Sequence, residues 1–268
     1  MEINIRKVFR EKNSSLAKWV PGFLFSYLEK IIHQKEVNQF LFLHGDKVGK
    51  EFTDAAIEFF NVSIELNGLE NIANHKRMNY VSNHPLGGFD GIILMSLLAQ
   101  QFGEVKVLVN DILMNIKNLE PFFLPINKHG AQNKTAITAI EEAYASQIPV
   151  LSFPAGLCSR KIEGKIVDLE WKKNFISKSI ETQRDIIPIH FEGRNSKFFY
   201  NLSNIRKKLG IKANIEMLYL VDELFRHRNG HFVINFGKPI PYTTFDKSRT
   251  QKEWAEFVKM QVYAMAKK

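Results

Sequence analysis

The clearest catalytic pattern in this chain is a histidine and an aspartate six positions apart, His84 and Asp90. The segment between them contains a proline and the glycines Gly87 and Gly88, which tolerate positive φ, so the chain can turn and bring the two side chains together. An imidazole held by a carboxylate suits proton removal from a hydroxyl group. The simpler alternative is that Asp90 only starts a helix and that His84 is an ordinary loop histidine.

An apolar run over residues 92–98 follows this turn. Its length and composition predict a buried helix, with Asp90 in the first turn. The partial positive charge at a helix amino terminus favours an ionised carboxylate.

A second segment combines a strand with cations. The apolar residues 150–153 predict a strand, and the chain then passes through Gly156 to Arg160 and Lys161. A guanidinium can grip a phosphate or carboxylate with two parallel hydrogen bonds, and a neighbouring ammonium adds a point charge. The segment therefore predicts an anion site, and the alternative is a solvated basic turn.

Periodicity along the chain predicts an α/β fold with a mixed central sheet flanked by helices and an N-terminal helical subdomain. We divide it into a helical, membrane-associating subdomain at 1–60 and an α/β domain at 61–268. Strands are expected at 62–66, 78–82, 105–109, 122–126, 149–153, 186–191 and 231–236. Helices are expected at 91–102, 134–146, 171–182, 197–209, 214–227 and 250–266.

Composition narrows the class of protein. The chain has 268 residues, a net charge of +9 and one cysteine, Cys158, so it forms no internal disulfide and no cysteine metal cluster. Its eight histidines show no metal-ligand spacing, and we predict no metal site. No secretory signal or membrane-spanning run is visible. The basic excess lies in residues 135–268, and a basic surface attracts acidic proteins, anionic membranes or nucleic acid.

The N-terminus predicts contact with a membrane surface. Apolar and basic residues alternate before an aromatic stretch, which suits an element lying in the bilayer interface. The alternative is that these side chains dock on the rest of the protein. The residues are Ile3, Ile5, Arg6, Lys7, Val8, Phe9, Arg10, Lys12, Trp19, Phe23, Phe25 and Tyr27.

Two further segments complete an ordered series: a strand at 122–126 followed by Lys128, and an apolar strand around Pro188. In order, the four segments resemble the four blocks of the glycerolipid acyltransferase family, over about residues 60–240. The first block matches Asn83, His84 and Asp90. The third, which begins Phe-Pro-Glu-Gly in the family, matches the segment 153–156.

The chain departs from the family pattern at three points. The spacer between His84 and Asp90 has five residues where the family usually has four, Ala155 stands in place of glutamate, and the third block lacks its Thr-Arg-Ser ending. These forms, with the segment 193–196, are similar to the subgroup associated with ornithine- or glycine-type aminolipids. The resemblance thus implies a lyso-aminolipid acceptor, with lysophosphatidic acid as the other possibility.

The resemblance implies direct acyl transfer without a covalent acyl-enzyme. His84 would remove the proton from the acceptor hydroxyl, and Asp90 would orient the imidazole. Backbone N–H groups at Gly87 and Gly88 would hold the developing oxyanion. Gly156 would let the backbone approach the acceptor, and the cations expected to hold its head group are Lys128, Arg160 and Lys161.

The partners expected from this resemblance are an acyl thioester and a membrane. The donor would be acyl carrier protein, whose acidic surface suits the basic second half, or acyl-CoA, with no resident cofactor. The protein is expected at the cytoplasmic face of the inner membrane, bound peripherally, and not on nucleic acid.

Two other classes of protein remain as alternatives. In a hydrolase, Cys158 or Ser82 would be the nucleophile with His84 as base, although neither lies in a recognisable nucleophile motif. A non-enzymatic protein would use the basic face to bind nucleic acid or a membrane. No nucleic-acid motif is present, and such a binder has no need of the four-block order.

Overall fold

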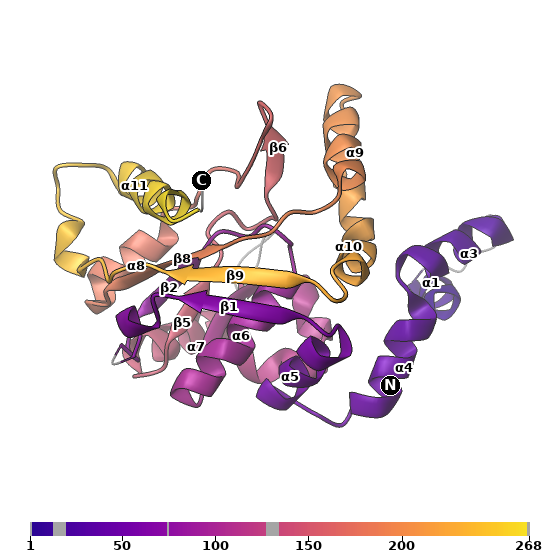
Figure 1. Ribbon diagram of the computed structural model, residues 1–268, viewed down its shortest axis with the longest axis horizontal. Coiled ribbons are helices and arrows are strands. Elements are labelled where there is room, and N and C mark those ends of the chain that lie inside the picture. Colours follow the sequence, from indigo (N-terminus) through magenta and orange to yellow (C-terminus); the bar gives the residue numbers. More distant parts are fainter. Residues whose placement is uncertain (1, 13–19, 74, 127–133, 267–268) are drawn as a thin grey trace.

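A computed structural model describes residues 2–12, 20–73, 75–126 and 134–266 (Figure 1). One mixed sheet runs through the centre, with helices on both faces, as the sequence predicts. Its strand order is β1-β9-β8-β2-β5-β3-β4. The bounds are β1 (Ser63–Asn67), β2 (Asn79–Ser82), β3 (Lys106–Asn110), β4 (Phe123–Ile126), β5 (Val150–Ser152), β8 (Ile186–Phe191) and β9 (His231–Phe236).

Five neighbouring strands of this sheet, β8, β2, β5, β3 and β4, run parallel to one another. β9 is antiparallel to β8 and parallel to β1, so β9 and β1 run in the direction opposite to these five strands. All six residues of β8 are buried, as expected for a strand covered on both faces.

Helices cover the two faces through two separate apolar clusters. Tyr80 faces the cluster that includes α5 and α6, whereas the next residue, Val81, faces α8 and α11, because successive strand side chains point to opposite faces. The bounds of these helices are α5 (Lys50–Phe59), α6 (Phe89–Phe102), α7 (Lys134–Ala145), α8 (Asn174–Thr182) and α11 (Gln251–Ala264). A capping box of Thr250 and Glu253 starts α11.

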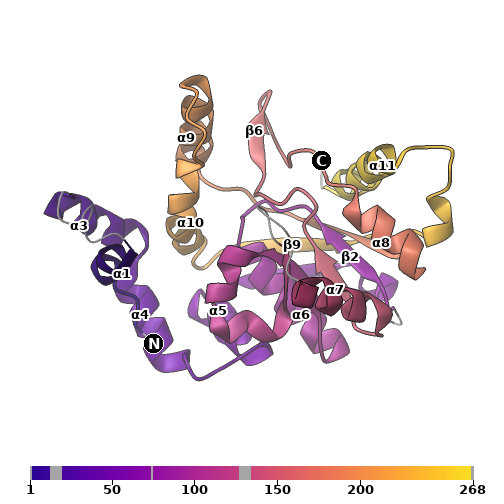
Figure 2. The same cartoon turned by 180° about the vertical axis from the view of Figure 1, so that it is seen from behind.

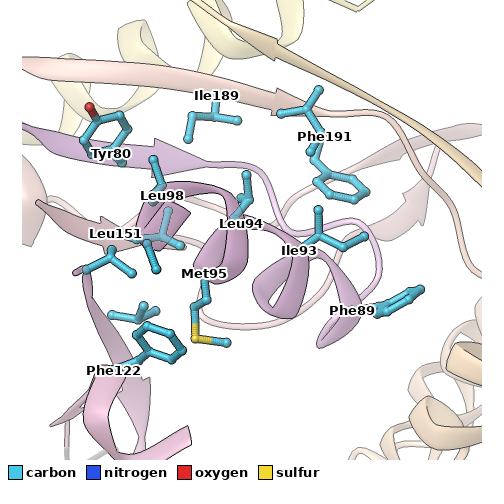
Figure 3. Packing of buried hydrophobic residues seen from close by; sticks show 14 of the residues in the cluster. Tyr80, Phe89, Ile93, Leu94, Met95, Leu98, Phe122, Leu151, Ile189 and Phe191 are labelled. Carbon is cyan, nitrogen blue, oxygen red and sulfur yellow. The ribbon is translucent and has the colours of Figure 1, made fainter. Parts of the chain in front are cut away.

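The helix that carries the aspartate of the catalytic pattern is the most deeply packed. α6 is apolar on nearly all sides and ends at Gly103, whose φ of 85° suits a helix terminus. Figure 3 shows Leu94 and Leu98 of α6 directed toward the sheet, where Tyr80 and Leu151 lie. This packing fixes the position of the first turn of α6.

The subdomain predicted at 1–60 includes α5, a helix that packs into the main core. α5 packs on α6 and buries Phe52, Ala56 and, at its end, Phe60 in the main core, so it belongs to the α/β domain. The preceding helices form an arm beside α9 and α10 (Figures 1 and 2). The bounds are α1 (Ile5–Lys12), α3 (Gly22–Ile31), α4 (Gln34–His44), α9 (Lys197–Lys208) and α10 (Leu220–Arg226).

Three local features differ from the sequence prediction. A hairpin of β6 (Arg160–Ile162) and β7 (Lys165–Val167) lies where a loop was expected. The helix expected at 171–182 begins only at α8, because the Trp171 side chain and the Lys172 backbone N–H are tied to Asp168 and Pro154. The helix expected at 214–227 is a 3-10 turn, η4 (Ile215–Tyr219), followed by α10.

The other 3-10 turns of the described residues are η1 (Leu69–Asn71), η2 (Asp111–Asn115), η3 (Lys117–Phe122) and η5 (Tyr242–Thr244). Within the described ranges, every helix is too short or too polar to cross a bilayer.

Candidate active site

The segments singled out in the sequence meet at one edge of the sheet. Because β2, β4, β5 and β8 are parallel, their carboxyl ends lie at the same edge, which is where open α/β sheets place their ligand sites. His84 follows β2, and Phe153 follows β5. The backbone N–H of Ser159 donates to the carbonyl of His84 at 2.8 Å, which ties these two segments together.

Asn83 joins the ends of β2 and β8. Its side-chain amide donates to the carbonyl of Phe191 at 3.0 Å and accepts from the Phe191 N–H at 2.7 Å. The side chain thereby continues the strand pairing beyond Ser82 and fixes the start of the turn that carries His84.

The structure brings His84 and Asp90 into direct contact, with Nδ1 of the histidine 3.0 Å from Oδ2 of the aspartate. Asp90 is completely buried. Its carboxylate also accepts the backbone N–H groups of Leu86, Gly88 and Gly91 at 2.9–3.0 Å. An acceptor opposite Nδ1 selects the tautomer that carries its proton there, and this leaves Nε2 of His84 as the basic nitrogen.

Charge and burial act in opposite directions on this pair. Burial alone would lower the pKa of His84, but the charge and hydrogen bond of Asp90, with the charge of Asp168, raise it above its ordinary value. Burial likewise favours a neutral Asp90, yet His84 and the backbone N–H groups of Leu86 and Gly91 hold the pKa of Asp90 below its usual range. The aspartate is therefore ionised at neutral pH and supports a charged imidazolium.

A second buried carboxylate, Asp168, positions the backbone of His84. Asp168 accepts the His84 N–H at 3.3 Å, the Ser159 hydroxyl at 2.6 Å and the Trp171 indole N–H at 2.8 Å. Burial raises the pKa of Asp168, and these hydrogen bonds oppose that shift. Sequence reasoning missed this residue, since nothing in its neighbourhood marks it as a partner of a turn 84 positions away.

The turn needs glycine at position 87 for two reasons. Gly87 has a φ of 79°, and a Cβ there would stand 2.8 Å from the Cβ of Cys158. Gly87 and Gly88 are the two predicted oxyanion donors. The structure corrects this for Gly88, because its N–H already donates to the Asp90 carboxylate at 3.0 Å. The N–H of Gly87 has no acceptor among the described residues, so it stays a predicted donor.

His84 lies at a cavity of about 620 Å³, which falls within the roughly 300–1,000 Å³ of ligand pockets. The wall is mostly apolar and comes from α6, the β3–β4 region, the segment after β5, and α10. The lining includes Phe89, Ile92, Met95, Val107, Val109, Leu113, Ile116, Leu119, Phe123, Phe153, Phe175, Leu220 and Leu224. The ring of Phe153 lies 4.4 Å from that of His84.

The predicted head-group residues are placed differently from one another. Gly156 lines the cavity. Lys161 is exposed on β6 and is not part of the wall, and Lys128 lies outside the described residues. For Arg160 the structure differs from the prediction, because its side chain is buried in a pair with Glu216 and does not line the cavity.

A buried ion cluster accounts for the position of Arg160. Glu216, at 0 % exposure, accepts from Nη2 of Arg160 at 3.0 Å and from Nε of Arg206 at 2.6 Å. Burial opposes its ionisation, but the hydrogen bond from Arg206 and the charges of both arginines hold the pKa of Glu216 below its usual range. The cluster links β6 to α9 and η4. Since Ser159 faces Asp168, the next residue of the extended chain, Arg160, faces the opposite side.

The two nucleophiles of the hydrolase alternative are poorly placed. Cys158 is fully buried, and burial raises the pKa of its thiol to about 11, whereas a nucleophilic cysteine needs a lowered value. The hydroxyl of Ser82 is buried and donates to the carbonyl of Asn83. The structure therefore gives no support to either residue as a nucleophile.

A second histidine in the cavity wall, His227, was not singled out in the sequence. Burial lowers its pKa, so the ring is neutral at pH 7, and its buried Nε2 has no partner among the described residues. In the part of the chain that is described, no three His, Cys, Asp or Glu side chains form a group able to hold a metal ion.

Comparisons with known proteins show similarity over almost the whole chain. The family model described as "Acyltransferase" matches residues 7–268. A lyso-glycine lipid O-acyltransferase of Phocaeicola vulgatus is 50% identical over 264 residues, which cover 98% of this chain and 95% of that protein. One from Bacteroides thetaiotaomicron is also 50% identical over 264 residues, covering 98% of this chain and 97% of that relative.

A solved structure gives the same fold at lower similarity. The 1-acyl-sn-glycerophosphate (LPA) acyltransferase PlsC of Thermotoga maritima has a TM-score of 0.50 and 18% sequence identity. The match covers 82% of this chain and 80% of that one. At 18% identity, this structural match supports the fold alone.

The ion cluster predicts a large loss of stability when Glu216 is replaced by alanine. Two buried guanidinium groups would lose their shared carboxylate, which costs about 3–5 kcal/mol in the free energy of unfolding. Chemical denaturation measures this. The matched control is Glu181→Ala, which breaks an exposed pair with Lys178 and costs at most about 1 kcal/mol. Similar losses for the two variants would contradict a supporting role for the cluster.

Proposed function

Because the chain belongs to the acyltransferase family and is an acyltransferase enzyme, we propose that it transfers a fatty acyl group from an acyl thioester to the hydroxyl of a lyso-aminolipid. The observation that carries the proposal is the His84–Asp90 pair at the wall of a large apolar cavity. The acceptor class follows the two relatives named as lyso-glycine lipid O-acyltransferases.

In the proposed reaction His84 is the general base. Nε2 takes the proton of the acceptor hydroxyl while its oxygen attacks the thioester carbonyl carbon. The C–S bond then breaks, and the departing thiolate takes the proton from the imidazolium. Asp90 stabilises the imidazolium through its 3.0 Å contact with Nδ1, and no covalent acyl-enzyme forms.

Stabilisation of the oxyanion is assigned to the turn before α6. The N–H of Gly87 has no acceptor among the described residues and belongs to a turn held by its close packing on Cys158. A donor that is fixed before the reaction lowers the barrier because it needs no reorganisation as charge develops.

The apolar cavity would hold fatty chains. Burying one methylene group contributes about 0.8 kcal/mol, so a long acyl chain gains much of its binding energy from such a wall. The donor would be acyl carrier protein or acyl-CoA, with no resident cofactor. The positive charge of residues 135–268 suits either acidic donor.

The direct test is acyl transfer by the purified protein from acyl carrier protein or CoA to a lyso-glycine lipid. We expect a diacylated product, and His84→Ala to lower kcat by about 10²–10⁴-fold, the usual contribution of a general base. His231→Ala is the matched control, since this histidine is exposed on β9 and outside the cavity wall.

Full activity of His84→Ala would contradict the assigned base. Faster acylation of lysophosphatidic acid than of the lyso-glycine lipid would contradict the assigned acceptor, because the head group would then be a phosphate.

Peripheral membrane binding is also part of the proposal. The arm docks on the domain through His33, which stacks on Phe225 at 4.0 Å and contacts Asp222 at 2.9 Å. That contact leaves Phe23 and Phe42 exposed, at 71% and 88%. Of the N-terminal residues predicted to meet a membrane, Trp19 and the side chains of Phe9 and Lys12 lie outside the described residues.

The hairpin of α9 and η4 adds to the same end of the molecule (Figure 1). It exposes Ile205, Leu209 and Leu218. Exposed lysines, Lys207 and Lys208, stand among them. Apolar side chains bordered by cations favour an anionic bilayer surface.

Vesicle flotation tests this surface. Replacing Phe23 and Phe42 by serine should weaken binding to anionic vesicles by at least about tenfold, since burying one phenylalanine contributes about 1.5–3 kcal/mol. Met260→Ser is the control: this exposed residue lies on α11, at the other end of the sheet from the arm. Equal flotation of the double variant and the unaltered protein would contradict the arm as a membrane contact.

A further inference from the structure

Among the described residues that line the apolar cavity, Lys172 is the one lysine or arginine, and it is partly exposed to solvent. The other titratable groups of that wall are the two histidines, His84 and His227. A single cation in an apolar cavity predicts a ligand that is an amphiphile with one anionic group.

The backbone of Lys172 is fixed on the segment that contacts His84. Its N–H donates to the carbonyl of Pro154 at 3.1 Å. The residue before it, Trp171, is held by Asp168, the same carboxylate that accepts the His84 N–H. Lys172 therefore starts from a backbone position that is set by the partners of the catalytic histidine.

The ammonium group reaches the cavity beside Gly156. A Cβ added to Gly156 would stand 3.7 Å from Nζ of Lys172, and Gly156 itself has a φ of 65°. With no side chain at that position, the space next to the ammonium stays open to a ligand.

Lys172 has no carboxylate partner among the described residues. The nearby Glu170 pairs with Lys252 at 2.8 Å. Asp168 is occupied by Ser159 and Trp171. By contrast Arg160, the cation that the sequence suggested for this task, is buried in a pair with Glu216 and does not line the cavity. Of these two cations, Lys172 is therefore the one placed to meet a ligand in the cavity.

We propose that Lys172 binds the anionic head group of the acceptor lipid and so orients the acceptor hydroxyl toward Nε2 of His84. The proposal rests on the function proposed above and specifies its acceptor site. A glycine joined to a lipid through its amino group keeps one carboxylate, which an ammonium pairs with directly. A phosphate head group would satisfy the same charge, and the experiment separates the two.

The test is equilibrium binding, which does not depend on turnover. Binding of a lyso-glycine lipid is compared with that of its uncharged methyl ester, for the unaltered protein, Lys172→Gln and Lys173→Gln. Lys173 is the matched control because it is the adjacent lysine, is exposed like Lys172, and does not line the cavity. We expect the unaltered protein to prefer the acid by about tenfold, the equivalent of one charge-assisted hydrogen bond, and Lys172→Gln alone to lose that preference.

Each other outcome decides a different point. A preference for the acid that survives in Lys172→Gln, or is absent from the unaltered protein, overturns the role of Lys172. Lysophosphatidic acid serves as the second ligand. If it binds tighter than the lyso-glycine lipid and Lys172→Gln removes that advantage, the lysine site stands and the proposed acceptor is wrong. Normal acylation of the lyso-glycine lipid by Lys172→Gln, with an unchanged acceptor KM, leaves the proposed function standing and the lysine site refuted.

Discussion

A buried carboxylate, Asp90, is the feature on which the site depends. Burial penalises its charge, so the surrounding chain must supply compensation, and it does so with three backbone N–H groups and the His84 ring. That compensation shapes the turn. The N–H of Gly88 donates to the Asp90 carboxylate, and Gly87 allows the close approach of the backbone to Cys158. The packing of α6 against the sheet then fixes the position of Asp90 and, through it, of the His84 ring.

Two carboxylates outside the cavity wall, Asp168 and Glu216, determine which cations remain available to a ligand in the cavity. Asp168 holds the backbone of His84 and the Trp171 ring, and Glu216 holds Arg160 within a buried cluster. Arg160 therefore supports the hairpin of α9 and η4, and Lys172 is the lysine that lines the cavity. One end of the sheet thus combines an apolar cavity, a histidine–aspartate pair and a single lysine in the described cavity wall.

Much of this arrangement could be predicted from local patterns. The alternation of strands and helices predicted the layered fold. The spacing of His84 and Asp90 predicted their contact, because a turn with glycines brings together residues that are close in sequence. The two-residue turn Glu163-Gly164 joins β6 and β7 with both φ values positive, but Glu-Gly is not one of the dipeptides that mark such hairpins, so the sequence does not predict this hairpin. The pairing of Arg160 with Glu216 and of Asp168 with His84 joins residues 56 and 84 positions apart, and no local pattern encodes it.

The central claim is that Asp90 holds His84 with its proton on Nδ1 and raises its basicity. Nitrogen NMR of the protein with ¹⁵N-labelled histidine, recorded across a range of pH, measures both the tautomer and the pKa of His84. We expect a neutral ring protonated at Nδ1, and a His84 pKa above the ordinary 6.5 that falls in Asp90→Asn. Since the folded-state pKa is raised, His84 favours the folded protein at low pH, and this contribution is lost as the pH rises through that pKa, where the free base appears. A ring protonated at Nε2, or a His84 pKa unchanged by Asp90→Asn, would contradict the account.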